Sequence, residues 1–155
     1  MHPDLEKIAS ELDSSDSGQA LALRFGLACV EEVAGNLESD EAIAVLERFR
    51  ACLASFGPES PAELQALSAS ITKLAASHPG SSSLDGSRHA AVSATYALAK
   101  AVNGQSIEAA AYAAYSSVYG YGGYAVSDPD AFSEVHRRQL DRLRALKQQD
   151  PPFGS

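Results

Sequence analysis

The stretch between residues 105 and 126 constrains the fold of this chain more than any other. It reads QSIEAAAYAAYSSVYGYGGYAV and combines alanines with tyrosines and glycines. Alanine is the best helix former, and its short side chain lets a neighbouring helix approach closely. The glycines Gly120, Gly122 and Gly123 favour the end of a helix. This stretch therefore predicts a helix at the centre of a bundle, followed by a glycine turn.

The composition of the whole chain favours the same class of fold. The 155 residues include 28 alanines and no tryptophan, and β-branched residues are few. Since Val, Ile and Thr favour strands, this composition predicts an all-α protein. A chain of this length is most simply one domain. We expect a single-domain bundle of about six to seven mostly antiparallel helices over residues 1–150, and a disordered tail over residues 151–155.

Seven segments carry apolar residues at helical spacing. The clearest is the second, in which Leu23, Leu27, Val30, Ala34 and Leu37 recur every three or four residues. None of the segments shows the alternation that is typical of a half-buried strand. The expected helices cover residues 3–13, 18–37, 40–56, 60–76, 86–103, 105–119 and 129–149.

Several of these segments begin or end with capping signals. Ser39 or Asp40 can cap the third helix, and Gly104 is a typical C-terminal stop for the fifth. The fourth helix begins with the sequence SPAE. That sequence predicts a capping box, in which Ser60 accepts hydrogen bonds from the first free amides and Glu63 completes the box.

The chain carries no signal for secretion or for a membrane span. It has no run of about 18 apolar residues. Its acidic start lacks the basic and apolar regions of a secretory signal. Cys29 and Cys52 fall within expected helices, where we expect buried reduced thiols, with a disulfide between them as the alternative. We therefore expect a cytoplasmic protein with no membrane partner.

The negative charge is concentrated in the first half of the chain. The net charge is −8, and residues 1–63 alone hold thirteen acids and four bases, a balance of −9. An acidic half argues against a nucleic-acid partner, because phosphate binding needs the opposite sign. It would suit a basic protein partner, whose association it could steer. The alternative is a solvated acidic surface that keeps the protein soluble.

The sequence contains no set of residues that predicts catalysis or a metal site. The pattern GYGGYA at residues 120–125 matches a dinucleotide-binding motif, but that motif needs a strand before it and a helix after it. The four histidines, including His89 and His136, are dispersed, so we expect structural or surface roles for them. Adjacent acids such as Glu31 and Glu32 diverge on a helix. We therefore expect no enzyme activity, no cofactor and no metal.

Five tyrosines lie between residues 112 and 124. Tyr112, Tyr115 and Tyr119 follow i, i+3, i+7 spacing, so one helix face can present all three. One interpretation is that they pack the bundle and send their hydroxyls to its rim. The other is a protein-binding surface, because tyrosine is enriched at interface hot spots.

Over residues 22–146 the chain resembles an alanine-rich family of immunity proteins from bacterial polymorphic toxin systems. The resemblance rests on RFGLACVEEVAGNL followed by DEAIAVLERFRACLASFGPESPAEL, on HAAVSATYALAKAV with SIEAAAYAAYSSVYGYGGYAV, and on FSEVHRRQLDRLRAL. The chain departs from the family pattern in lacking a Trp in the closing helix, where His136 lies near the expected place. It is also richer in tyrosine and glycine around residues 119–124.

The resemblance implies a protein that neutralises a cognate toxin by stoichiometric binding and catalyses no reaction. From the acidic half of the chain we expect this toxin to be basic. The alternatives are a helical scaffold that acts through homo-oligomerisation, and a small-ligand binder or enzyme with a pocket between helices. Two sets of residues are candidates for partner binding. The acidic set is Glu31, Glu32, Glu38, Asp40, Glu41 and Glu47. The aromatic set, for the toxin or for a homodimer, is Tyr112, Tyr115, Tyr119, Tyr121 and Tyr124.

Overall fold

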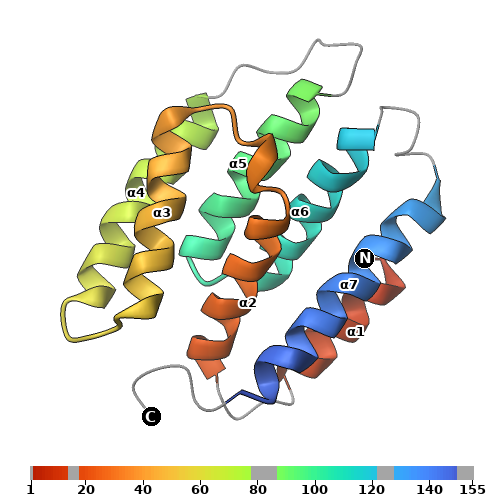
Figure 1. Ribbon diagram of the computed structural model, residues 1–155, viewed down its shortest axis with the longest axis horizontal. Helices are drawn as coiled ribbons and strands as arrows, with labels where there is room; N and C mark the ends of the chain where they lie inside the picture. The colour runs from red at the N-terminus through yellow and green to blue at the C-terminus, as the bar shows by residue number, and fades with distance from the viewer. Residues whose placement is uncertain (1, 14–17, 78–86, 122–127, 150–155) are drawn as a thin grey trace.

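The computed structural model describes residues 2–13, 18–77, 87–121 and 128–149, and the regular structure of these residues is entirely helical. Seven α-helices and one short 3₁₀ helix, η1, form a single-domain bundle (Figure 1), which confirms the predicted fold class. The expected tail over residues 151–155 lies outside the described residues. In chain order the elements are α1 (Pro3–Asp13), α2 (Gly18–Glu32), η1 (Ala34–Asn36), α3 (Asp40–Ala54), α4 (Ser60–Ser77), α5 (Ser87–Val102), α6 (Ser106–Tyr121) and α7 (Pro129–Lys147).

The hairpin of α5 and α6 forms the centre of the bundle, and α2 packs against both helices. Alanines make this close packing possible, since Ala94 of α5 and Ala110 of α6 are completely buried. The approach of α2 is tighter still. A Cβ atom placed on Gly26 would lie 3.1 Å from the Cβ of Ala101 in α5 and 3.2 Å from its Cα. The centre of the bundle therefore depends on small residues, as the alanine-rich sequence predicts.

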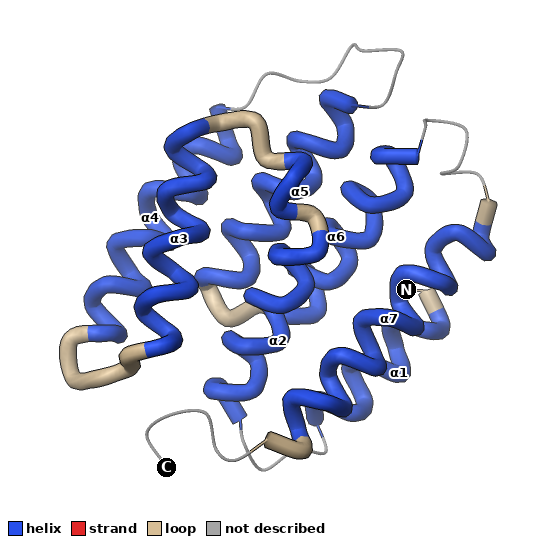
Figure 2. The backbone as a smooth tube through the Cα atoms, in the orientation of Figure 1, coloured by secondary structure: helices blue, strands red, loops and turns tan. Residues whose placement is uncertain are grey.

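Two pairs of helices flank this centre (Figure 2). On one side α3 and α4 form an antiparallel hairpin, and α4 also packs against α5. On the other side α1 lies along α7. These two helices run in the same direction, because His2 at the start of α1 contacts His136, whereas Glu11 near its end contacts Arg144. The bundle is thus mostly antiparallel, and α1 with α7 is an exception.

The α-helix α2 ends earlier than its apolar spacing predicts. We expected it to continue to Leu37, but it stops at Glu32 and the chain continues as the 3₁₀ helix η1. The side chain of Asn36 in η1 donates to the hydroxyl and the carbonyl oxygen of Ser116 in α6, at 3.0 and 3.3 Å. These bonds connect η1 to α6. The spacing of apolar residues within one helix gives no information about such a contact. The other expected helices agree with the observed ones to within two residues at each end.

Two of the predicted capping signals are confirmed. The hydroxyl of Ser39 accepts a hydrogen bond from the backbone N–H of Ala42 at 3.3 Å, at the start of α3. Gly104 has a φ of +80°, a conformation that glycine adopts without strain. The following N–H, of Gln105, donates to the carbonyl of Lys100 at 2.9 Å, which closes the end of α5.

The predicted capping box at the start of α4 is wrong. The hydroxyl of Ser60 accepts from the backbone N–H of Gly57 at 2.8 Å instead of from the helix amides. The backbone N–H of Glu63 donates to the carbonyl of Glu59, at 3.2 Å. Ser60 is buried and turned toward the preceding loop. It therefore stabilises the turn between α3 and α4, and backbone bonding satisfies the helix start.

Both cysteines are free and buried, as we expected of reduced thiols. Burial raises the pKa of the Cys29 thiol well above its ordinary value, and it raises the pKa of Cys52 as well. Both groups are therefore protonated thiols at neutral pH, which are poor nucleophiles. Within the described residues, no helix has the length and apolar character that a membrane crossing requires.

Candidate functional site

All six acidic residues that we expected to face a partner are exposed, but two of them face cations of this same chain. Glu31 lies 3.6 Å from the guanidinium of Arg50. Partial burial raises the pKa of Glu32, and the positive charges of Arg138 and Arg142 on α7 partly oppose that rise. A cavity of about 230 Å³ opens beside Glu31. The basic residues that line this cavity are Arg24, Arg50 and Arg142. The end of α2 is therefore a surface of mixed charge.

The remaining acids belong to α3 and to the residues just before it. Glu38, Asp40, Glu41 and Glu47 are exposed and form no ion pair with any described residue. Asp40 and Glu41 lie in the first turn of α3, where negative charge is favourable to the helix dipole.

An exposed isoleucine lies among these acids. The side chain of Ile43 is 37% exposed, which makes it one of the two large apolar residues that the described surface presents. Asp40, Ile43 and Glu47 are three and seven residues apart and so share one side of the helix. Glu41, two residues from Ile43, lies on another side of the helix. We call Asp40, Ile43 and Glu47 the α3 outer face. It combines an apolar centre with acidic neighbours, which is the usual pattern of a protein-binding patch.

The tyrosines of α6 divide between packing and exposure. Tyr112 is half-buried and stacks on Tyr96 of α5, with ring centroids 5.4 Å apart. Tyr119 is also half-buried and stacks on His89 of α5, at 4.7 Å. Tyr115 is the other large apolar residue of the described surface, with 44% of its area exposed. The helix therefore uses two of these tyrosines to pack against α5 and presents the third.

Tyr115 belongs to a small aromatic cluster between α6 and α7. Its ring lies 5.1 Å from that of Phe132 in an edge-to-face arrangement, and 6.3 Å from that of Tyr119. The structure thus brings Tyr115 and Tyr119 together, as their spacing predicts. Tyr121 lies in the last turn of α6, although its side chain is outside the described residues, and Tyr124 lies outside them altogether.

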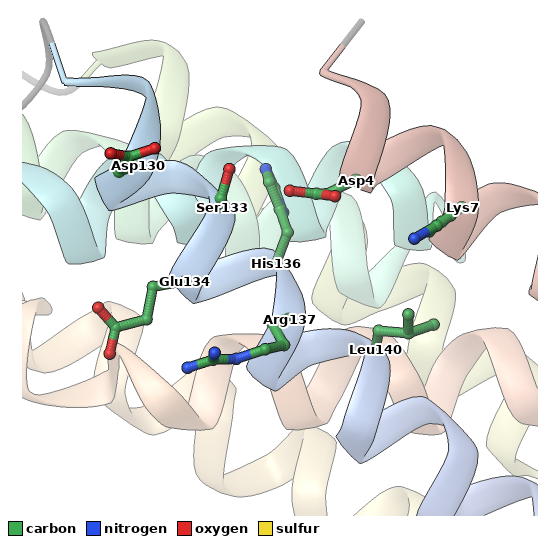
Figure 3. A pocket seen from close by; sticks show the side chains of 8 residues that line it. All are labelled: Asp4, Lys7, Asp130, Ser133, Glu134, His136, Arg137 and Leu140. Carbon is green, nitrogen blue, oxygen red and sulfur yellow. The ribbon is translucent and has the colours of Figure 1, made fainter.

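A pocket of about 420 Å³ lies between α1 and α7, and nothing in the sequence signals its position (Figure 3). Its lining carries charges of both signs. The charged residues of the lining are Asp4, Lys7, Asp130, Glu134 and Arg137. Figure 3 shows the imidazole of His136 between the side chains of Ser133 and Asp4, with Lys7 reaching in from α1. The volume lies within the range of small-molecule sites, which is about 300–1,000 Å³.

His136 is the most deeply buried ionisable residue of this pocket, with 3% of its area exposed. Its Nδ1 lies 2.7 Å from Oε1 of Gln139, whose Nε2 donates to the backbone carbonyl of Ala110 in α6 at 3.0 Å. Burial lowers the pKa of His136, the hydrogen bond that its ring makes to Gln139 raises it in part, and the nearby His2 lowers it further. The imidazole is therefore neutral at pH 7.

His2 and His136 lie 134 residues apart in the sequence, so their contact could not be predicted from it. Their ring centroids are 5.0 Å apart. The backbone N–H of Asp4 donates to Nδ1 of His2 at 3.1 Å, which also orients the first histidine. In the part of the chain that the structure describes, however, no three His, Cys, Asp or Glu side chains form a group that could hold a metal ion.

Comparisons of this chain with protein-family models, with curated proteins and with solved structures found no match. The function therefore has to be argued from the surfaces themselves. The α3 outer face, the aromatic cluster around Tyr115 and the pocket at His136 are the three candidates. The resemblance to immunity proteins stays a prediction.

Proposed function

We propose that this protein binds a basic partner protein through the α3 outer face, and that it acts as an immunity protein which neutralises a bacterial toxin by stoichiometric binding. The observation that carries the proposal is the exposed Ile43 among carboxylates that have no cation partner in the described part of the chain. Apolar residues surrounded by polar ones supply much of the energy of protein interfaces. The resemblance to the immunity family points in the same direction.

The charge pattern indicates how such a complex would form. Unpaired carboxylates on one side of α3 attract a basic surface over a distance of about 10 Å at moderate salt. Attraction of this kind raises the association rate and orients the two proteins. Ile43 would then be buried against the partner, so that desolvation of its side chain slows dissociation. Under this proposal the protein covers or distorts the active site of its toxin and performs no chemistry.

We place the protein in the cytoplasm as part of this proposal, because both of its cysteines are free thiols and an immunity protein has to act where its toxin would damage the producing cell. The chain uses no cofactor under this account. The acidic character of its first half also disfavours nucleic acid as the partner.

The two exposed large apolar residues allow a matched test of the surface. Ile43→Ser and Tyr115→Ser each remove one exposed apolar side chain, from α3 and α6 respectively. Binding to the product of the neighbouring gene is measured for both variants by surface plasmon resonance, after circular dichroism has shown that each is folded. We expect Ile43→Ser to weaken binding by about tenfold or more, which corresponds to about 1.4 kcal/mol. Tyr115→Ser should leave it unchanged.

The opposite result would move the binding surface to the aromatic cluster, and equal affinities for both variants and the wild-type protein would contradict both surfaces. The aromatic cluster also supports a second candidate function, a scaffold that acts through a homodimer. Tyr115 is exposed beside Phe132, and tyrosine is cheap in entropy to fix at an interface. A dimer in sedimentation analysis that Tyr115→Ser dissociates would favour this alternative.

A further inference from the structure

The hydrogen bonds around His136 determine which of its nitrogens carries the proton. The backbone carbonyl of Ala110 can only accept, so the amide nitrogen of Gln139 has to donate to it. The carbonyl oxygen Oε1 of Gln139 is then turned toward His136 and has to accept from Nδ1. The neutral imidazole therefore holds its proton on Nδ1, and its Nε2 is a hydrogen-bond acceptor.

Only 3% of the area of His136 is exposed, yet its Nε2 has no hydrogen-bond donor among the described residues. The ring of His2 lies beside it, but Nδ1 of His2 is occupied by the backbone N–H of Asp4, and no hydrogen bond joins the two rings. A buried acceptor without a donor is destabilising, and proteins satisfy such groups with water or with a ligand. Because His136 lines the pocket between α1 and α7, that donor would lie in the pocket (Figure 3).

The charges of the pocket indicate the chemistry of its ligand. Asp4 lies next to the imidazole in Figure 3, so a donor at Nε2 would also be close to a negative charge. This combination favours an ammonium group over a neutral hydroxyl. Lys7 and Arg137 also line the pocket and form no ion pair within the described part of the chain. Lys7 offers a site for an anionic group on the same ligand, whereas Arg137 points away from the imidazole, toward Glu134 (Figure 3).

We propose that the pocket between α1 and α7 binds a small zwitterion of the α-amino acid class. Its ammonium group donates to Nε2 of His136 beside Asp4, and Lys7 holds its carboxylate. A cavity of about 420 Å³ accommodates a molecule of this size. The site goes beyond the proposed function, and Figure 1 shows that α1 and α7 lie on the other side of the bundle from α3.

Nuclear magnetic resonance of the full chain with ¹⁵N-labelled histidine tests the proposal at the atom that carries it. Long-range ¹H–¹⁵N spectra distinguish protonated from unprotonated imidazole nitrogens. Each of the common L-amino acids is added at millimolar concentration, and the expected result is a saturable shift of the Nε2 signal of His136 with at least one of them. The N-trimethylated betaine of that amino acid keeps both charges but has no N–H to donate, and it should produce no such shift.

The exposed Lys7 tests the carboxylate end without disturbing the core. Lys7→Gln should raise the dissociation constant of the amino acid by about tenfold, because it removes a charge-assisted contact. Arg142→Gln is the control, since Arg142 is an exposed cation outside this pocket. The proposal is overturned if no amino acid shifts Nε2 saturably, if the betaine binds equally well, or if Lys7→Gln binds like the wild-type protein.

Discussion

Gln139 shows how one residue can decide the state of another. It lies on the buried stripe of α7 between Val135 and Leu143, where a hydrocarbon side chain would be expected. Its amide spans from the Ala110 carbonyl of α6 to the imidazole of His136, and it thereby fixes the tautomer of the histidine. A buried amide of this kind is tolerated because hydrogen bonds inside the protein replace those to water. The pair therefore connects the packing of α6 and α7 to the chemistry of the pocket.

The burial of His136 makes the stability of the protein depend on pH. Its pKa in the folded state lies below the ordinary value of 6.5, so the unfolded chain binds more protons as the pH falls through that value. The free energy of unfolding should therefore decrease between about pH 7 and about pH 5. His136→Gln, which does not titrate, should lose this part of the slope. Denaturant unfolding of both proteins across that range checks the prediction, and parallel curves would contradict it.

Val135, Leu143 and Leu146 recur at helical spacing along α7, and all three are buried. That spacing could not predict that His136 and Gln139 are buried with them. The partner of the Gln139 amide nitrogen belongs to α6, and spacing within one helix carries no information about a carbonyl in another. Leu140 shares the apolar spacing but is only half-buried.

The crossing of α2 over α5 is the element contact that tolerates the least change. Gly26 faces Ala101 so closely that an added Cβ would lie 3.1 Å from the Cβ and 3.2 Å from the Cα of that residue. The second of these atoms is backbone, so a rotamer change cannot relieve the contact. The two helices would have to separate, and the surrounding core would have to follow them.

Gly26→Ala should therefore destabilise the protein. Overpacking of this kind costs about 1–3 kcal/mol, which exceeds the gain of roughly 1 kcal/mol that alanine brings to a helix interior. Gly35→Ala is the matched control, because nothing lies within 4 Å of the Cβ that it would add. Its stability should change by less than about 0.5 kcal/mol. Urea unfolding of both variants measures the difference, and a Gly26→Ala protein more stable than the wild type would show that the helices separate easily.

The helices themselves were predictable because their alanine content and apolar spacing are local properties. The ends of the helices were less predictable wherever a residue far away in the sequence stabilises them. Ser39 and Gly104 act through neighbouring backbone groups, and both were predicted correctly. The end of α2 depends on Ser116 of α6, and the start of α4 depends on how Ser60 is buried against the preceding loop. Neither was evident from the sequence.

For the molecule as a whole, the sequence placed the negative charge in the first half but could not distinguish paired from unpaired carboxylates. Glu31 and Glu32 share the end of α2 with arginines of α3 and α7, and they contribute less to an external field than their number suggests. Asp40 and Glu47 form no ion pair with the described residues, and the exposed Ile43 shares their side of α3. These tertiary contacts are the reason that we propose α3 as the partner surface.

The central claim is that the α3 outer face binds a basic toxin, and isothermal titration calorimetry at low and high salt tests it most directly. The titrant is the product of the neighbouring gene, and the proteins compared are the wild type, Glu47→Lys and Glu31→Lys. We predict 1:1 binding that weakens as salt rises, with a much smaller salt dependence for Glu47→Lys than for Glu31→Lys. Absence of binding by the folded wild-type protein, or an affinity that neither salt nor Glu47→Lys changes, would contradict the claim.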